Sequence, residues 1–257
     1  MNVIIATFSK TIKEFLREKS TLFWTIVWPI IWVLIDGFVF VSGAPKKVTP
    51  YIRGSITISM MTFALTLAGM VNLPGNISRD KERGLLTKLK SMPVSPWKDF
   101  VGRISGLVAF SCLASVLVIL TGFACGARFS GSIVSVFQSI IFFLIIFFAS
   151  AGVGLIVGTL IKHVQGAVMI GVGISVVTAS ISGPFAPYWS FPSILQRFSQ
   201  VYPVSSASAA IIYLLLGKSY VGYNPLGINQ VVTTIALSSS LFVIGLVLYS
   251  RFCWRRE

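Results

Sequence analysis

The chain has 257 residues, of which 55% are hydrophobic and only 11% are charged. Because a soluble domain carries about 25% charged residues, this composition excludes a soluble globular enzyme, a disordered chain and a disulfide-rich secreted scaffold, and we expect lipid to be the solvent for most of the chain. The 21 lysines and arginines against 7 acidic residues give a formal charge of +14, an excess that in a membrane protein indicates cytoplasmic loops rather than binding to nucleic acid.

The first twenty residues are predicted to form an amphipathic helix. Ile5, Phe8 and Ile12 recur every three or four residues, while Lys10 and Lys13 lie on the opposite face. Such a helix lies on the cytoplasmic leaflet with its basic residues toward anionic headgroups, so membrane lipid is an expected partner. The pattern is also consistent with contact to a partner protein.

Six later runs are apolar enough to cross a bilayer, which requires about 20 residues for each helix. They are Leu22–Val41, Ser55–Leu73, Ile104–Cys125, Ile133–Leu160, Val164–Ile181 and Ile228–Ser250. We therefore predict a single all-α polytopic membrane domain over residues 1–257, with six transmembrane helices.

Asp36 lies in the outer third of the first predicted span and is the one ionisable residue that lies clearly inside a span. Ionisable side chains in spans are costly, and many of them line a transport pathway. A carboxylate this near the helix end can also reach interfacial water. Asp36 is thus a candidate pathway residue, with contact to interfacial water as the alternative.

Residues 76–100, between the second and third spans, have the most informative pattern. Charged residues come first, and four apolar side chains then recur at the spacing of one helix face: Leu85, Leu86, Leu89 and Met92. Pro93 and Pro96 are expected to end this helix. Because so short a helix is unstable alone, it needs a bilayer or a protein surface to bury its leucines. An ordinary basic loop on the inner side is the alternative.

Three Gly-x-x-x-Gly pairs occur within the predicted spans or across their ends, at positions 102/106, 122/126 and 154/158. Pairs of this kind let two helices approach closely. Packing within one subunit is the usual use, and a dimer contact by one of the pairs is the alternative.

Residues 183–217 are expected to form a hairpin that enters the outer face of the membrane and returns. Ser193–Val201 is predicted to be a short amphipathic helix, and Val204–Leu216 is apolar. At about 1.5 Å per residue the second helix reaches about 20 Å, short of a hydrocarbon core of about 30 Å. Pro192 and Pro203 interrupt the pair.

The distribution of basic residues predicts the orientation. With the amino terminus inside, the six-span topology places fifteen of the 21 lysines and arginines on the cytoplasmic side. An excess of Lys and Arg in cytoplasmic loops is what sets orientation. We therefore expect a multi-pass protein of the cell (plasma) membrane with both termini in the cytoplasm.

Two stretches carry a family resemblance. One is Arg79-Asp80-Lys81-Glu82-Arg83-Gly84-Leu85-Leu86, followed by Leu89 and Pro93-Val94-Ser95. The other runs from Ser182-Gly183-Pro184-Phe185-Ala186-Pro187 to Tyr202-Pro203-Val204. They resemble the cytoplasmic coupling loop and the outer re-entrant hairpin of ABC-2 type permeases, the membrane subunits of ATP-binding-cassette exporters. The resemblance extends over nearly the whole chain.

This resemblance implies a permease subunit that moves a lipophilic or lipid-linked solute out of the cell. It implies two partners: a second permease subunit, in a homodimer or a heterodimer, and a separate ATP-binding-cassette ATPase. It also implies a set of residues that couple to the ATPase: Asp80, Glu82, Arg83, Gly84, Leu85, Leu86, Leu89 and Pro93. Glu82 and Arg83 would make polar contacts, Gly84 would allow close approach, and the leucines would bury apolar surface.

A nucleotide site on this chain is not expected. Gly217-Lys218-Ser219 has the ending of a phosphate-binding loop, but Ile212 stands where the loop needs its first glycine. ATP and Mg are therefore expected on the partner ATPase, and we expect no cofactor, metal or catalytic residue on this chain. It is predicted to be a transport subunit and not an enzyme.

Two other functions remain open at this point. A gradient-driven secondary transporter or channel would work alone, and Asp36 would be its candidate ion-handling group. A non-transporting membrane scaffold or assembly factor would bind partners without solute flux. Intramembrane catalysis is the weakest reading, because no span presents a paired Ser/His, paired Asp or His-rich metal set.

Overall fold

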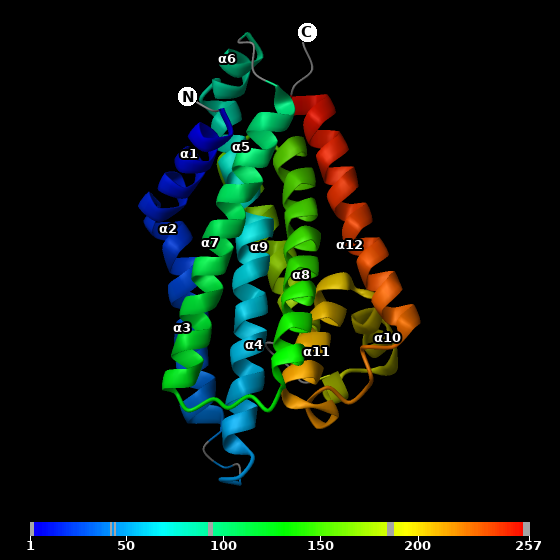
Figure 1. The fold of residues 1–257 in the computed structure, drawn as a ribbon. Helices are drawn as coiled ribbons and strands as arrows, with labels where there is room; N and C mark the ends of the chain where they lie inside the picture. Colours follow the sequence, from blue (N-terminus) through cyan, green and yellow to red (C-terminus); the bar gives the residue numbers. More distant parts are fainter. Residues whose placement is uncertain (1–2, 42, 44, 92–94, 184–187, 254–257) are drawn as a thin grey trace.

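The structure is a computed structural model that describes residues 3–41, 43, 45–91, 95–183 and 188–253. Within these ranges all regular secondary structure is helical. Figure 1 shows a bundle of long helices side by side. The first helix, α1 (Val3–Arg17), and the end of the last long helix, α12 (Ile228–Leu248), lie at the same end of the bundle as α6 (Leu85–Ser91). We call this the α6 end.

Six helical segments of the described chain are long and apolar enough to cross a membrane, as predicted. They are Lys19–Val39, Thr49–Glu82, Pro96–Ala124, Ile133–Leu160, Val164–Ile181 and Ile228–Cys253. The third, fourth and fifth are α7, α8 and α9. The other three contain π-helical turns and consist of several elements each. The first span consists of α2 (Lys19–Leu22), η1 (Phe23–Val27), α3 (Trp28–Ile35) and η2 (Asp36–Phe40), and the second of α4 (Thr49–Leu67), η3 (Ala68–Asn72) and α5 (Leu73–Glu82). The sixth consists of α12 and η6 (Tyr249–Cys253).

The second span does not end at Leu73, as the apolar pattern predicted, but continues to Glu82. Its 34 residues reach about 50 Å at 1.5 Å per residue, whereas a hydrocarbon core is about 30 Å thick. The residues of α5 are more polar than those before them, but polar side chains do not interrupt the backbone hydrogen bonds of the helix. The segment predicted as the start of a loop is therefore a rigid extension of the span at the centre of the bundle.

The helix predicted at residues 1–20 is α1, and it packs on α7. Thr7 and Phe15 are buried in this contact. A Cβ atom at Gly102 would lie 2.6 Å from the carbonyl oxygen of Ile4, so only glycine permits the approach. The predicted amphipathic helix is thus confirmed, with one face covered by protein, and the contact of its exposed apolar residues, such as Ile5 and Leu16, with the lipid leaflet stays a prediction.

The other two glycine pairs also serve packing inside this chain. Gly122 of α7 faces Thr57 of α4, and Gly154 of α8 faces Gly69 of η3. A Cβ atom at Gly122 would overlap the side chain of Thr57, and one at Gly154 would overlap the backbone of Gly69, so neither position has room for a side chain larger than hydrogen. Close approach of this kind is how helices associate in lipid, where the hydrophobic effect gives little driving force.

The predicted hairpin is present as α10 (Ser193–Val201) and α11 (Pro203–Leu216), which meet at 87°. Pro203 begins α11, where a missing N–H is tolerated, and Gly217 ends it with a φ of +95°. α11 packs against α8 and α4, in the half of the bundle opposite α6 (Figure 1). Residues 184–187 of the family-like motif lie outside the described residues.

Candidate functional site

The residues predicted to couple to an ATPase lie together at the α6 end. Glu82 is the last residue of α5, and a turn at Arg83 and Gly84 separates it from α6. Gly84 has a φ of +65°, a conformation that side chains disfavour, so glycine stops one helix and starts the next. The helix predicted from the leucine spacing therefore begins at Leu85, and Met92 and Pro93 lie outside the described residues.

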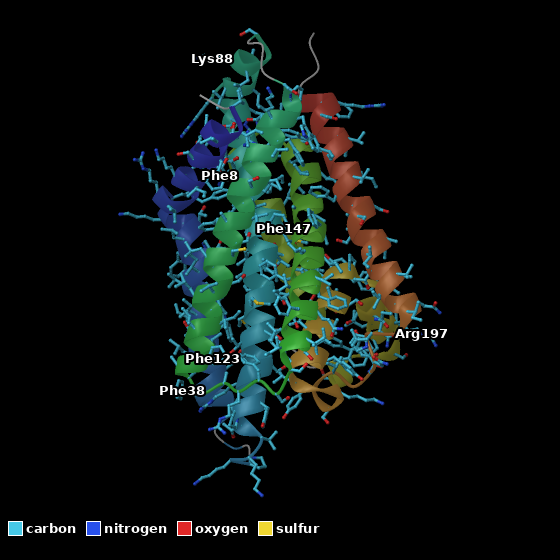
Figure 2. All side chains as sticks on the ribbon, in the orientation of Figure 1. Phe8, Phe38, Lys88, Phe123, Phe147 and Arg197 are labelled. Atoms are coloured by element: carbon cyan, nitrogen blue, oxygen red, sulfur yellow. The ribbon has the colours of Figure 1, made fainter. Side chains whose placement is uncertain are left out.

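α6 presents a polar face and hides an apolar one. Arg83, Thr87 and Lys88 are exposed, and Figure 2 shows Lys88 extending from the tip of the molecule. Leu86 is only 4% exposed and belongs to the apolar core of this chain. Leu85 and Leu89 are half-buried. The side chain of Leu86 is thus already buried within this chain, whereas Leu85 and Leu89 keep some free surface, and the contact of these leucines with a partner stays a prediction.

Asp80 lies inside the protein, in a cluster that we call the Arg103 cluster (Asn76, Asp80, Asp99, Arg103 and Tyr249). Asp80 Oδ2 is 2.7 Å from Nη2 of Arg103, and Asp99 Oδ2 is 3.4 Å from the same nitrogen. The hydroxyl of Tyr249 donates to Asp99 Oδ2 at 2.7 Å, and Arg103 also donates to the amide oxygen of Asn76. The cluster joins α5, α7 and η6, so any part that Asp80 takes in coupling passes through the groups it binds.

A second set of contacts, which we call the α1–α5 polar row, ties α1 to α5. It consists of three pairs: Lys10–Asp80, Glu14–Asn76 and Glu18–Arg79. Lys10 Nζ donates to Asp80 Oδ1 at 2.5 Å, and Asn76 Nδ2 donates to Glu14 Oε2 at 2.5 Å. Lys10 and Glu14 are four residues apart in α1 and share one helix face, and Glu18 directly follows the end of α1. That face is engaged by protein, in addition to the face packed on α7.

The last turn of α5 also holds the connection between α8 and α9. Lys81 Nζ donates to the carbonyl oxygens of Gly158 and Thr159, at 2.7 and 2.5 Å, near the carboxyl end of α8. Glu82 Oε1 accepts from the backbone N–H of Val164 at 2.8 Å, at the start of α9. A cation at a helix carboxyl end and an anion at an amino end both interact favourably with the helix dipole. Neighbouring charges of α5 thus fasten two successive spans.

Sequence reasoning identified Asp80, Glu82 and the α6 residues but missed Asn76, Asp99, Arg103 and Tyr249. A signal existed for one pair, because Asp99 and Arg103 are four residues apart and share a helix face. Nothing in the sequence pointed to Tyr249, which comes from the far end of the chain. In the part of the chain that the structure describes, no three His, Cys, Asp or Glu side chains gather as a metal site.

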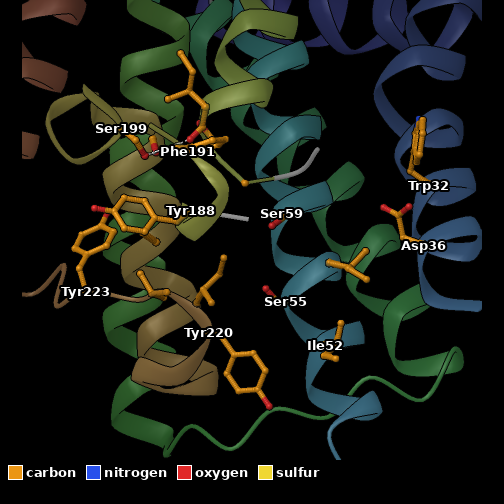
Figure 3. A pocket seen from close by; sticks show the side chains of 18 of the residues that line it. Trp32, Asp36, Ile52, Ser55, Ser59, Tyr188, Phe191, Ser199, Tyr220 and Tyr223 are labelled. Atoms are coloured by element: carbon orange, nitrogen blue, oxygen red, sulfur yellow. Dashed lines mark hydrogen bonds between the residues drawn. The ribbon is translucent and has the colours of Figure 1, made fainter. Parts of the chain in front are cut away.

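Asp36 lies elsewhere, at the wall of a cavity of about 580 Å³ in the half of the bundle opposite α6. The cavity lies between the first span, α4 and the α10–α11 hairpin. Figure 3 shows Trp32 and Asp36 on one side, Ser55 and Ser59 on α4, and Tyr188 on the other side. Of the two sequence alternatives for Asp36, lining a cavity matches its position, and its part in a transport pathway stays a prediction.

Comparison with known proteins places this geometry in a family. The family model described as "ABC-2 type transporter" matches residues 2–216. The match includes α1, the α5–α6 region, most of the residues that line the cavity, and the hairpin as far as the end of α11.

Two relatives from Escherichia coli (strain K12) are similar to this chain. "Probable multidrug ABC transporter permease YbhR" is 26% identical over 148 residues, which are 57% of this chain and 39% of YbhR. "Inner membrane transport permease YhhJ" is 23% identical over 199 residues, which are 76% of this chain and 49% of YhhJ. The matched region thus spans less than half the length of either relative.

Proposed function

Since the chain belongs to the ABC-2 type transporter family and has six helices suited to cross a membrane, we propose that it is the permease subunit of an ATP-driven exporter. In this proposal the α6 end faces the cytoplasm and meets a separate ATPase that holds ATP and Mg. A second permease subunit, identical or related, completes the pathway in the plasma membrane. A lipophilic or lipid-linked solute passes outward.

The observation that carries the proposal is the way in which α5 connects α6 to the spans. Through the Arg103 cluster it joins α7 and η6, and through the polar row it joins α1. Through Lys81 and Glu82 it joins α8 and α9. A force applied to α6 therefore reaches α1, α7, α8 and α9 through direct hydrogen bonds of α5, and it reaches η6 through Asp99 of α7. Because packed interfaces shift between discrete arrangements, such a connection moves spans as units.

The charges at the α6 end support the orientation. Arg83 and Lys88 are exposed there, where a soluble partner has access, and Lys and Arg concentrate on the cytoplasmic side of membrane proteins. The free surface of Leu85 and Leu89, together with the polar face of α6, suits a groove on the partner that has an apolar floor and a polar rim, as is usual for protein interfaces. The description of YbhR as a probable multidrug permease supports a lipophilic solute.

Site-specific photocrosslinking in cells tests the proposal. A photoreactive amino acid replaces Lys88, and in a matched control it replaces Arg197, which is also basic and exposed but lies far from α6 (Figure 2). We expect the Lys88 position alone to form an adduct with a protein that contains Gly-x-x-x-x-Gly-Lys-Ser/Thr, identified by mass spectrometry. ATP-dependent solute flux of the purified complex in proteoliposomes completes the test.

Three results would overturn the proposal. One is the absence of any nucleotide-binding adduct at Lys88, or an equal adduct at Arg197. Another is transport by this chain alone, driven by an ion gradient in liposomes and lost in Asp36→Asn, which would indicate a secondary transporter. The third is a stable complex with the ATPase that shows no nucleotide-dependent flux, which would indicate a scaffold.

A further inference from the structure

The cavity beside Asp36 has the size and chemistry of a binding site for a small molecule. Its volume of about 580 Å³ lies within the range of roughly 300–1,000 Å³ that is typical of ligand pockets. Its walls are mostly apolar, with a few polar groups from different elements. This combination usually encloses an apolar ligand and fixes its orientation by a small number of polar contacts.

Asp36 gives the cavity a negative charge. Among the residues that line it, Asp36 is the one with a side chain charged at neutral pH. Burial raises the pKa of Tyr220 and of Tyr223 above the usual range, so these phenols stay neutral. No side chain in the described part of the chain forms an ion pair or a hydrogen bond with Asp36.

Nearby cations are engaged elsewhere. Arg53 of α4 lies between Ile52 and Ser55 in the chain, both of which line the cavity. It donates to the carbonyl oxygens of Gly37 and Cys125, each at 2.8 Å. Its guanidinium also lies 4.9 Å from the centre of the Phe38 ring. Arg53 is not among the residues that line the cavity. Among the residues that the structure describes, no cation therefore forms an ion pair with the Asp36 carboxylate.

The rest of the wall suits a cation with an apolar body. Trp32 lies on the same side as Asp36, and tyrosines line the opposite side (Figure 3). The rings of Tyr188 and Tyr223 are 4.7 Å apart between centroids. Aromatic faces attract cations through their quadrupole, and they offer large apolar area. Ser182, which is 6% exposed, has no hydrogen-bond partner for its hydroxyl in the described chain, so a polar group of a ligand has a contact available.

We propose that this cavity binds a lipophilic organic cation, with the cationic centre beside Asp36 and the apolar body between Trp32 and the tyrosines. The class of ligand follows from the negative charge of Asp36, because unlike charges attract each other more strongly in a partly buried site than in bulk water. For the same reason an anionic lipid-linked phosphate is repelled by Asp36. The proposal names a substrate class for the exporter and in that respect rests on the proposed function, but the binding itself needs no ATPase.

The test uses two probes of nearly equal size and shape and opposite charge, tetraphenylphosphonium and tetraphenylborate. The chain is purified from its own membrane with any subunit that accompanies it and placed in nanodiscs, and equilibrium dialysis measures binding against empty nanodiscs. We expect saturable binding of tetraphenylphosphonium and at least ten-fold weaker binding of tetraphenylborate. Asp36→Asn should weaken phosphonium binding at least ten-fold, and Asp36→Glu should restore most of it.

A matched control removes a carboxylate at the other end of the molecule. Glu18→Gln takes away the same charge near α1 and should leave phosphonium affinity within two-fold. If Asp36→Asn does not fold, the comparison of the two probes on the unmodified chain and on Asp36→Glu still decides the matter. Equal binding of both probes, or unchanged phosphonium affinity in a folded Asp36→Asn, would overturn the proposal.

The two proposals fail separately. The binding experiment involves no nucleotide and no crosslink to α6, so its failure would leave the ATPase contact at Lys88 standing. Conversely, loss of the Lys88 adduct together with charge-selective binding in the cavity would retain the cation site and reject the ATP-driven exporter.

Discussion

The guanidinium of Arg103 and the carboxylate of Asp80 form an ion pair of 2.7 Å between α7 and α5, and each side chain is 1% exposed. Lys10 reaches the other oxygen of Asp80 at 2.5 Å, so one carboxylate connects three helices. Two charges buried this deeply are costly to separate, because removal of one leaves the other without compensation. The pair therefore holds the base of the α6 extension in one arrangement.

Replacement of Arg103 by methionine should be strongly destabilising. We expect Arg103→Met to lower the free energy of unfolding by about 3–5 kcal/mol, because Asp80 and Asp99 would lose the cation that they share. Denaturant unfolding in nanodiscs, followed by tryptophan fluorescence, measures the change. Arg79→Gln is the matched control: its pair with Glu18 is partly exposed, so the expected loss is at most about 1 kcal/mol. Equal losses in the two variants would show that burial of the pair does not matter.

Hydropathy was sufficient to predict the spans, because a helix that crosses the hydrocarbon core must be apolar over that length, whether it faces lipid or, like the second span, other helices. The fourth and fifth spans, Ile133–Leu160 and Val164–Ile181, have the predicted bounds, since polar residues begin at Lys162 and Ser182. The second does not, because its polar continuation, α5, is buried among other helices and keeps its backbone hydrogen bonds. Hydropathy reports the solvent around a helix, and backbone hydrogen bonding sets its length.

The contacts inside the coupling region could not be predicted from the sequence for a different reason. Asp80 and Tyr249 are far apart in the chain, and only the packing of α5 and of α12 on α8 brings them to the same end of the bundle, where Asp99 and Arg103 of α7 link them. In the same way, the apolar spacing of Leu85, Leu86 and Leu89 identified a helix face but not its partner. The structure assigns Leu86 to this chain, whereas a leucine pattern alone is equally consistent with a partner protein.

Two substitutions in α6 should therefore have separable effects. Lys88→Glu, on the exposed face, should reduce recovery of the ATPase with the permease at least ten-fold while leaving unfolding unchanged, because it alters a surface charge and no internal contact. Leu86→Ala should lower the free energy of unfolding by about 2–5 kcal/mol, as other buried leucines do. Affinity purification and denaturant unfolding of both variants measure the two effects. The assignment of faces would be wrong if Lys88→Glu destabilised the chain and Leu86→Ala did not.

The contact of Lys81 with the end of α8 should transmit movement to the spans. Lys81→Met would remove two hydrogen bonds from a charged donor, each worth about 1.5–3 kcal/mol. We expect the complex still to form and to hydrolyse ATP, but to transport at least five-fold less solute per ATP, because the carboxyl end of α8 would lose its bonds to Lys81 of α5. Parallel assays of phosphate release and solute flux in proteoliposomes give this ratio.

Lys162→Met is the control for that experiment. Lys162 is an exposed lysine in the same α8–α9 turn, so its loss removes an equal charge without the contact to the α8 carbonyl groups. Its ratio of flux to hydrolysis should equal that of the unmodified complex. If both variants lost flux equally, the effect would come from charge at the turn and not from the bonds that Lys81 makes.

Two glycines of α9 that are two residues apart should respond in opposite ways to the same added methyl group. A Cβ atom at Gly171 would overlap the carbonyl oxygen of Met70, whereas one at Gly173 would meet no atom within 4 Å. Gly171→Ala forces the backbones of α9 and η3 apart and should lower the free energy of unfolding by about 1–3 kcal/mol. Gly173→Ala should raise it by up to about 1 kcal/mol, because alanine loses less backbone entropy in a helix. Denaturant unfolding of both variants in the same lipid compares them directly, and a loss of stability in Gly173→Ala equal to that in Gly171→Ala would mean that the close contact between α9 and η3 is not formed.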